Sequence, residues 1–304
     1  MKALFDTDKN RNKESTGIFY GMYVLAMLMF GTNGYLVAHI SLQSSQIVLV
    51  RTIIGGLILT ALLLVRKDIS LSRIQSELHN LLFGGIALGL NWVALFTAYR
   101  LLNVSLATLI YYAGPMLVML LSPRIFREKL TNIKIAAIAI VAVGLFCISG
   151  SIAAGRLSIA GLVTAIGSAL LYAALIVFNK RIKNTSGIQT AALELDVAFV
   201  IVLLYVLLTK GISLPLASDI PYLLVIGLMN TGLAYLLYFT GLQRLPAQSV
   251  ALLSYVDPVS ALLFSALLLN ESMTVLQIAG AVLIIGGAII GELDRKHFYA
   301  ESNL

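Results

Sequence analysis

Ten stretches of the chain are apolar and nearly free of charge, and short polar segments separate them. Each stretch is 18–22 residues long, and about 20 apolar residues are enough for an α-helix to cross a bilayer core of about 30 Å. The ten stretches cover about residues 17–37, 46–65, 80–99, 104–122, 133–150, 159–178, 188–208, 220–241, 248–269 and 275–292. No segment between them is long enough to fold as a separate domain. The pattern therefore predicts an all-α integral membrane protein with ten transmembrane helices.

The composition agrees with this pattern. Of 304 residues, 59% are hydrophobic and only 12% are charged, whereas about a quarter of the residues of a soluble domain are charged. The mean hydropathy is +0.95. A surface with so little charge must face something other than water, so the lipid bilayer is the first expected partner. The single cysteine, Cys147, has no second cysteine with which to form a disulfide within the chain.

The basic residues predict the orientation of the helices. Residues 1–16 are polar and lack the apolar core and cleavage site of a secretory signal, so the first helix is expected to be an uncleaved span. If the N-terminus is cytoplasmic, 17 Lys and Arg residues lie in cytoplasmic segments and 3 lie on the other side. An excess of Lys and Arg in cytoplasmic loops sets orientation during insertion. Both termini, residues 1–16 and 294–304, are thus predicted to be cytoplasmic tails, and the net charge of +7 needs no nucleic-acid partner.

One phrase occurs twice, at a constant offset of 143 residues. Residues 102–115 read LNVSLATLIYYAGP and residues 245–258 read LPAQSVALLSYVDP. The same offset matches Gly84 with Gly227 and Glu128 with Glu271. Each half holds five predicted helices, an odd number, so the second half must enter the membrane upside down. The sequence predicts two inverted five-helix repeats, residues 17–150 and 151–293, a plan that recurs in secondary transporters with a solute site near the midplane.

These features together resemble a known family. Ten helices in a five-plus-five inverted repeat, with YYAGP followed by Glu128 in one half and SYVDP followed by Glu271 in the other, are similar to EamA-type members of the drug/metabolite transporter superfamily. The resemblance covers nearly the whole chain, from Gly17 to about Gly291. It implies a multi-pass carrier of the cytoplasmic membrane, commonly one that exports amino acids or related metabolites. It does not imply one particular substrate.

Four ionisable residues lie inside predicted spans, where a charge costs about 2.5–3.5 kcal/mol at the helix centre. They are Arg51, Glu194, Asp196 and Asp257. The offset relates Arg51 to Glu194, so one half offers a cation where the other offers an anion. These two could simply hold helices together by pairing, or they could face a central cavity and contact the solute. Glu194 and Asp257 are the predicted proton-coupling residues, although Asp257 could instead bond backbone groups that the adjacent Pro258 leaves exposed.

Aromatic and amide side chains at the same depth complete the predicted site. Rings with one polar edge suit a cavity for an amphipathic solute, and their faces can accept a cation. The predicted substrate-binding residues are Arg51, Asn91, Trp92, Tyr111, Tyr112, Glu194, Tyr235, Tyr238 and Tyr255. Pro115 and Pro258 are predicted hinges. Glu128 and Glu271 are interpreted as caps of the last helix of each half, because an acid complements the start of a helix.

The sequence therefore predicts a secondary transporter that exports a small amphipathic metabolite, an amino acid or an amine, across the cytoplasmic membrane. It is expected to work by alternating access, with proton coupling as one possible driving force. An enzyme is disfavoured, because no His-Glu-x-x-His pair is present and His39, His79 and His297 lie at span ends. No cofactor or metal is expected. Two alternatives stay open. One is an exchanger for nucleotide-sugar or phosphate-ester substrates, for which Arg51 alone offers little charge. The other is a passive channel, although no selectivity filter is visible.

Overall fold

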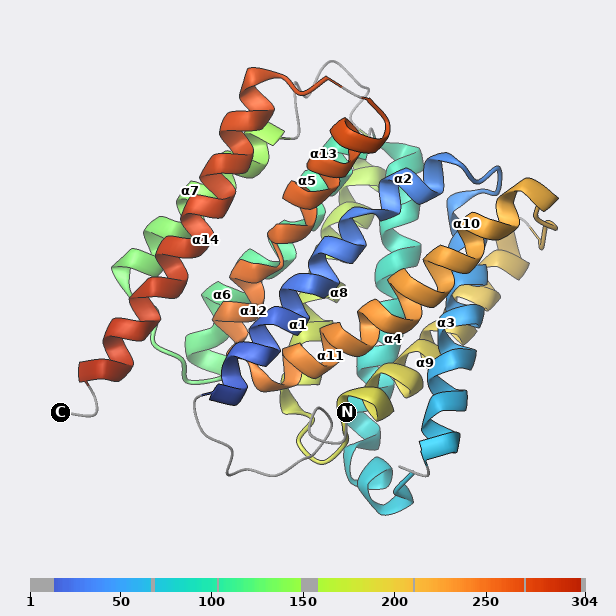
Figure 1. The fold of residues 1–304 in the computed structure, drawn as a ribbon, viewed down its shortest axis with the longest axis horizontal. Coiled ribbons are helices and arrows are strands. Elements are labelled where there is room, and N and C mark those ends of the chain that lie inside the picture. The colour runs from blue at the N-terminus through green and yellow to red at the C-terminus, as the bar shows by residue number, and fades with distance from the viewer. Residues whose placement is uncertain are drawn as a thin grey trace.

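The computed structural model describes residues 14–66, 69–102, 104–148, 158–209, 211–270 and 272–301, and helices make up nearly all of this part of the chain (Figure 1). The first repeat contains α1 (Glu14–Gly31), α2 (Asn33–Ala38), α3 (Ser44–Arg66), α4 (Leu71–Leu101), α5 (Val104–Tyr111), α6 (Ala113–Ile125) and α7 (Asn132–Ile148). The second contains α8 (Ile159–Arg181), α9 (Gly187–Thr209), η2 (Ala217–Asp219), α10 (Ile220–Val225), η3 (Ile226–Leu233), α11 (Ala234–Arg244), α12 (Ala247–Leu253), α13 (Val256–Leu268) and α14 (Val275–Glu301).

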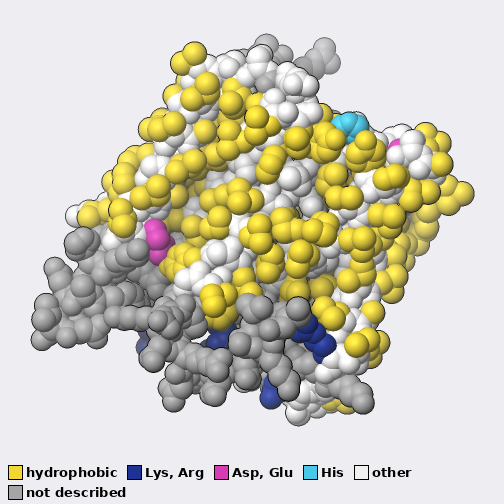
Figure 2. All heavy atoms as spheres, viewed as in Figure 1, with side chains coloured by type: hydrophobic (Ala, Val, Ile, Leu, Met, Phe, Trp, Pro, Cys, Tyr) yellow, Lys and Arg dark blue, Asp and Glu magenta, His cyan; other side chains and the backbone are white. Residues whose placement is uncertain are grey.

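These helices account for the predicted spans. Nine segments of the described chain are long and apolar enough to cross a membrane, and α7 is a tenth, shorter apolar helix. Residues 149 and 150, the end of the predicted fifth span, lie outside the described residues. Hydrophobic side chains cover most of the face shown in Figure 2, and Lys and Arg gather along its lower edge, near the end where α1 begins. The described part of this face is thus apolar, as expected of a surface in contact with lipid, with basic residues at one end.

The 143-residue offset relates the helix boundaries as well as the amino-acid residues. Helix α3 begins at Ser44 and α9 at Gly187, and α7 begins at Asn132 and α14 at Val275. Even the turn after the fourth span is reproduced, because Arg127 and its counterpart Asn270 both adopt positive φ angles, of 57° and 55°. The repeated sequence therefore forms repeated local structure.

Counterpart helices run antiparallel where they meet. Gly144 of α7 packs on Gly280 and Ile284 of α14, whereas Gly287 packs further back, on Val141. The two helices lie side by side at one edge of the molecule (Figure 1). Helices α3 and α9 behave alike, since Gln46 reaches the carbonyl of Gly211 while Thr60 reaches Asp196. This relative orientation is the one that an inverted repeat requires.

The fourth and ninth spans are each broken at the repeated phrase. Helix α5 ends at Tyr111 and α6 begins at Ala113, while α12 ends at Leu253 and α13 begins at Val256. Pro115 and Pro258 lie in the first turn after each break, and a proline cannot donate a hydrogen bond to the residue one turn earlier. The two breaks meet in space, because the Tyr255 hydroxyl donates to the Tyr112 carbonyl at 2.9 Å.

Candidate functional site: a cavity between the repeats

A cavity of about 530 Å³ lies among the first four spans and the sixth, eighth and ninth. Its volume falls within the range of about 300–1,000 Å³ that is typical of small-molecule sites. Gly34, Val37 and Ser44, from the end of the first span and the start of the second, line it. Helix α2, which contains Gly34 and Val37, lies at the end of the molecule opposite the start of α1 (Figure 1). The cavity therefore lies toward one end of the helix bundle.

Arg51 of α3 is the cation in the cavity wall. Its Nε donates to the Thr231 hydroxyl at 3.0 Å, and its guanidinium lies 5.3 Å from the centre of the Trp92 ring. Thr231 in turn donates to the Ile226 carbonyl at 2.9 Å, five residues back within the π-helical turn η3. The Thr231 hydroxyl accepts only from Nε, so the two terminal nitrogens of Arg51 remain able to bind a solute carboxylate through their N–H groups.

Asp257 of α13 is the anion of the same cavity. The Tyr112 hydroxyl donates to its Oδ2 at 3.0 Å, and this bond crosses between the two repeats. Its counterpart Gly114 has no room for a side chain, because a Cβ there would lie 2.8 Å from the Ala169 carbonyl oxygen. The glycine of the first repeat therefore lies where helices pack closely, whereas the aspartate at the same position of the second repeat lies in the cavity wall.

Aromatic rings form most of the remaining wall. Tyr235 lies edge-on to Trp92, with the ring centres 5.8 Å apart, and Tyr111 stacks on Tyr172 at 5.1 Å. Asn91, Tyr112 and Tyr238 line the cavity as well, and the Asn91 amide donates to the Ser168 carbonyl at 2.7 Å. An apolar solute with polar ends would therefore contact ring faces along its length.

The structure brings seven of the nine predicted substrate-binding residues to this cavity. Tyr255 does not line it, because the ring is buried against Tyr112. Glu194 does not line it either, since the carboxylate is completely buried and packs on Gly84. Arg51 and Glu194 form no ion pair with each other in this described part of the chain, because Glu194 pairs with Asn179 instead, at 3.0 Å.

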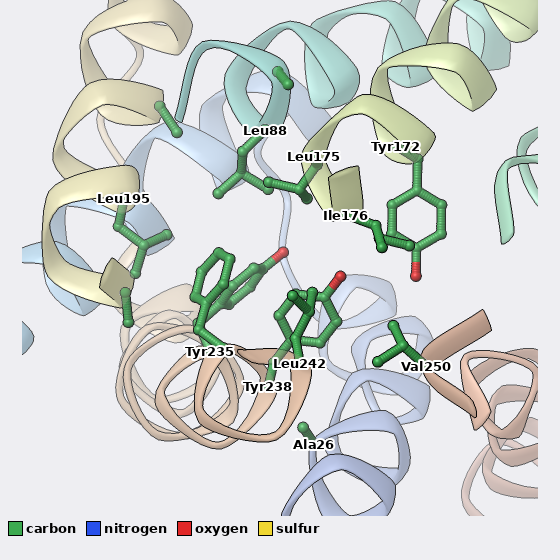
Figure 3. Packing of buried hydrophobic residues seen from close by; sticks show 14 of the residues in the cluster. Ala26, Leu88, Tyr172, Leu175, Ile176, Leu195, Tyr235, Tyr238, Leu242 and Val250 are labelled. Atoms are coloured by element: carbon green, nitrogen blue, oxygen red, sulfur yellow. The ribbon is translucent and has the colours of Figure 1, made fainter. Parts of the chain in front are cut away.

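A hydrophobic layer closes the cavity on the side of Glu194. Leu88 and Leu175 line the cavity floor, and Figure 3 shows their side chains close together above Tyr235 and Tyr238. Gly84 and Asn179, which hold Glu194, each lie four residues from one of these leucines, or about one helical turn. Glu194 is therefore one layer below the floor.

The closed end of the bundle is fastened by polar contacts between the repeats. The Glu128 carboxylate accepts from the backbone N–H groups of Ala247 and Gln248, at 2.7 and 3.0 Å. Gln248 also contacts the Lys134 ammonium and donates to Ser122. Glu128 is thus a cap, but of α12 in the other repeat; its interpretation as a cap of the helix that follows it is wrong. Glu271 lies outside the described residues.

Sequence reasoning missed several cavity residues, among them Phe96, Tyr99 and Tyr172. The signal for two of them was present. On α4 the lining residues recur at helical spacing, so the stripe that contains Trp92 continues to Phe96 and Tyr99. Tyr172 has no such neighbour in the predicted site, and only the packing of α8 against α4 brings it to the cavity.

The chain matches the model of the EamA-like transporter family twice, at residues 15–150 and 159–291. It is also similar to a solved crystal structure with a TM-score of 0.80 and 21% identity, which covers 93% of this chain and 99% of that one. At this identity the structural likeness concerns the fold alone. The two family matches cover most of the chain.

Curated relatives of the chain are transporters. An uncharacterized transporter of Bacillus subtilis (strain 168), YxxF, is 27% identical over 96% of this chain and 94% of its own length. A probable amino-acid metabolite efflux pump of Salmonella typhimurium is 30% identical over 64% of this chain and 70% of its own. The threonine/homoserine exporter RhtA of Escherichia coli (strain K12) is 25% identical over 79% of this chain and 78% of its own length.

Proposed function

Because this chain belongs to the EamA-like transporter family, we propose that it exports a small amphipathic metabolite, an amino acid or an amine, by alternating access across the cytoplasmic membrane. The transporter class and the multi-pass membrane location follow from the family and from the apolar helices. The proposed substrate class draws on the two relatives named for amino-acid export. The proposed direction draws on the same two names.

The observation that carries the substrate class is the presence of Arg51 and Asp257 in one aromatic-lined cavity. A carboxylate of the solute would bind the guanidinium, and an ammonium would bind Asp257. The rings between them would contact the rest of the solute through their faces. A zwitterion satisfies both charges, whereas an amine satisfies only Asp257.

Proton coupling is proposed to use two acids, Asp257 in the cavity wall and the buried Glu194. A proton and a solute ammonium can both neutralise Asp257, so they would compete for it. Competition of this kind couples the outward movement of one to the inward movement of the other. Glu194 offers a second protonatable group, outside the present cavity.

Alternating access is supported by a difference between the two repeats: positions that line the cavity in the first repeat have tightly packed counterparts in the second. The counterparts of cavity residues Val48 and Thr108 are Ala191 and Ala251, and both alanines are 0% exposed. A second conformation, in which the repeats exchange roles, would open a cavity at these positions. We propose that Pro115 and Pro258 are the hinges, since each follows a helix break that the structure shows.

Two observations weigh against the alternatives. Among the described residues that line the cavity, Arg51 is the one cation, and a phosphate ester or nucleotide sugar would favour several. A passive channel would need an open path, but Leu88 and Leu175 lie between the cavity and the fully buried Glu194.

The test is solute transport by the purified protein in liposomes, with labelled amino acids and amines screened by counterflow. Arg51→Gln should weaken binding by about 2–5 kcal/mol, as expected when one member of a desolvated charge pair is lost. Arg100→Gln is the matched control, because Arg100 is exposed and bonds Tyr205 outside the cavity. Wild-type behaviour of Arg51→Gln would contradict the proposed site.

Proton coupling has a separate test. Asp257→Asn and Glu194→Gln keep shape and hydrogen bonding but remove a protonation site. Glu194→Gln, outside the solute cavity, should abolish accumulation driven by a pH gradient and spare exchange of labelled for unlabelled solute, which moves no net proton. Asp257→Asn should reduce both, because Asp257 is also the proposed partner of the solute ammonium. Asp196→Asn is the control, because Asp196 bonds Thr60 away from the cavity. Full pH-driven accumulation by both acid variants would leave facilitated exchange as the mechanism.

A further inference from the structure

Two buried oxygen atoms below the cavity floor have no hydrogen-bond donor among the described residues. They are Glu194 Oε1 and Asn179 Oδ1, and both side chains are 0% exposed. The same two side chains are already joined, because Asn179 Nδ2 donates to Glu194 Oε2 at 3.0 Å. A buried polar atom without a partner destabilises the folded state, so two of them on one joined pair need an explanation.

A single proton would satisfy both atoms. An ionised carboxylate is an acceptor only, but a protonated carboxyl also has an O–H donor. If Glu194 Oε1 carries the proton, it can donate to Asn179 Oδ1 while Asn179 Nδ2 donates back to Oε2. The second hydrogen of the amide is used as well, since Nδ2 also donates to the Leu175 carbonyl at 3.1 Å. Every polar atom of the pair then has a partner.

We infer that Glu194 is protonated in this conformation and forms a cyclic acid–amide pair with Asn179, so that the pair is an occluded proton site separate from the solute cavity. The proton would be released when the second repeat opens, because Glu194 is the counterpart of the cavity residue Arg51. This last step rests on the proposed function, whereas the protonation state does not.

The described elements around Glu194 offer no cation to hold it ionised. Helix α9 packs against α3, α4 and α11, and Asn179 lies on α8. Among the described residues, Asn179 is the one whose side chain bonds the Glu194 carboxylate. None of the charged and titratable groups on these described elements has a hydrogen bond or ion pair with it. They are Arg51 and Arg66 on α3, Arg73, Glu77, His79, Tyr99 and Arg100 on α4, Tyr172, Lys180 and Arg181 on α8, Asp196 and Tyr205 on α9, and Tyr235, Tyr238 and Arg244 on α11.

No metal ion is needed to explain the two oxygens. The Glu194 carboxylate lies directly on the backbone of Gly84, where even a Cβ would overlap it. A bound cation would need several more oxygen ligands around it, and this packing leaves no space for them. A proton needs no space.

Infrared spectroscopy of the purified protein without solute tests the inference. The wild type should show the C=O band of a protonated carboxyl at neutral pH, and Glu194→Gln should remove it. Asp196→Asn is the matched control on the same helix and should leave that band in place. The amide introduced by Glu194→Gln can still pair with Asn179 through two hydrogen bonds, so the fold should be retained. A spectrum that Glu194→Gln leaves unchanged overturns the inference.

A second variant keeps the inference testable if Glu194→Gln does not fold. Asn179→Leu retains the carboxyl and removes its partner, so the same band should move to higher frequency. An unmoved band would overturn the pairing. Both readouts need neither solute nor a gradient. Loss of the band in Glu194→Gln together with absence of pH-driven transport in the wild type would therefore contradict the proposed coupling and leave the proton site intact.

Discussion

The regions around Arg51 and Glu194 occupy counterpart positions in the two repeats, yet one is hollow and the other is packed. Arg51 faces a cavity of about 530 Å³. Glu194 is completely buried among neighbours that are also buried, including Ala191, Thr190 and Leu195. Counterpart positions of the two repeats therefore differ in packing within one molecule.

The difference indicates what holds the molecule in this state. At the packed end, Glu128 of the first repeat caps α12 of the second, and Gln248 bonds Ser122. The Tyr23 hydroxyl bonds the Ser254 hydroxyl nearby, at 2.8 Å. These contacts cross between repeats, so opening this end must break them. A state in which they are broken must form equivalent contacts at the other end to have similar energy.

The largest expected effect comes from adding volume at one counterpart pair. Val48→Phe projects into the cavity, so the protein should fold but lose transport because the ring occupies solute space. Ala191→Phe has no such space and should destabilise the fold by overpacking, by about 1–3 kcal/mol or more. Thermal unfolding in detergent measures stability, and counterflow measures transport. Equal stability of the two variants would contradict the difference in packing between Val48 and Ala191.

The next effect concerns access to the same two regions. In a background with Cys147→Ala, Thr108→Cys should react with a membrane-impermeant thiol reagent, because Thr108 lines the cavity. Ala251→Cys should react at least about tenfold more slowly in the absence of solute, because Ala251 is 0% exposed. If the predicted orientation is right, the fast label comes from the external face. Equal labelling of both cysteines from one face would contradict the difference in packing between the two repeats.

A smaller effect is expected from loss of the Glu128 cap. Glu128→Ala leaves the N–H groups of Ala247 and Gln248 without their acceptor, and loss of a cap typically costs about 0.5–2 kcal/mol. Because the cap joins the repeats only at the packed end, the variant should also speed labelling of Ala251→Cys. Lys129→Ala, at the adjacent position, is the control. A variant that loses stability without faster labelling would show that the cap supports the fold but not the closed state.

The smallest effect is expected at the two prolines. Pro115→Ala and Pro258→Ala allow one more helical hydrogen bond across each break, which should stiffen the span. Turnover should fall several-fold while the affinity for solute changes less, since neither proline lines the cavity. Rates and half-saturation values from the liposome assay separate the two quantities. Unchanged turnover in both variants would assign the prolines to packing.

Much of the fold could be predicted because it depends on local and periodic features. Span length follows from runs of apolar residues, whereas the helix breaks at Tyr112 and Tyr255, just before the predicted hinges Pro115 and Pro258, came from the structure. Arg51 and Asp257 were candidates for the site because charge inside a bilayer is costly wherever it occurs. That both line one cavity follows from the fold and not from the sequence pattern.

Other features could not be read from local patterns. The π-helical turn that presents Thr231 to Arg51 lies at Ile226–Leu233, whereas its first-repeat counterpart belongs to the regular helix α4. The partner of Glu128 is 119 residues away. Both depend on contacts between helices that are distant in the chain.

The sequence by itself determined a ten-span membrane protein made of two related halves, because the length of the apolar runs and the internal repeat can be read directly from the amino-acid sequence. Only the tertiary structure decided which end is hollow, and that Asp257 faces the cavity while Glu194 is sealed one turn below its floor. The physical reason is that span length and repetition are local properties of the sequence, whereas which counterpart positions pack tightly depends on contacts between the halves, such as Glu128 with α12.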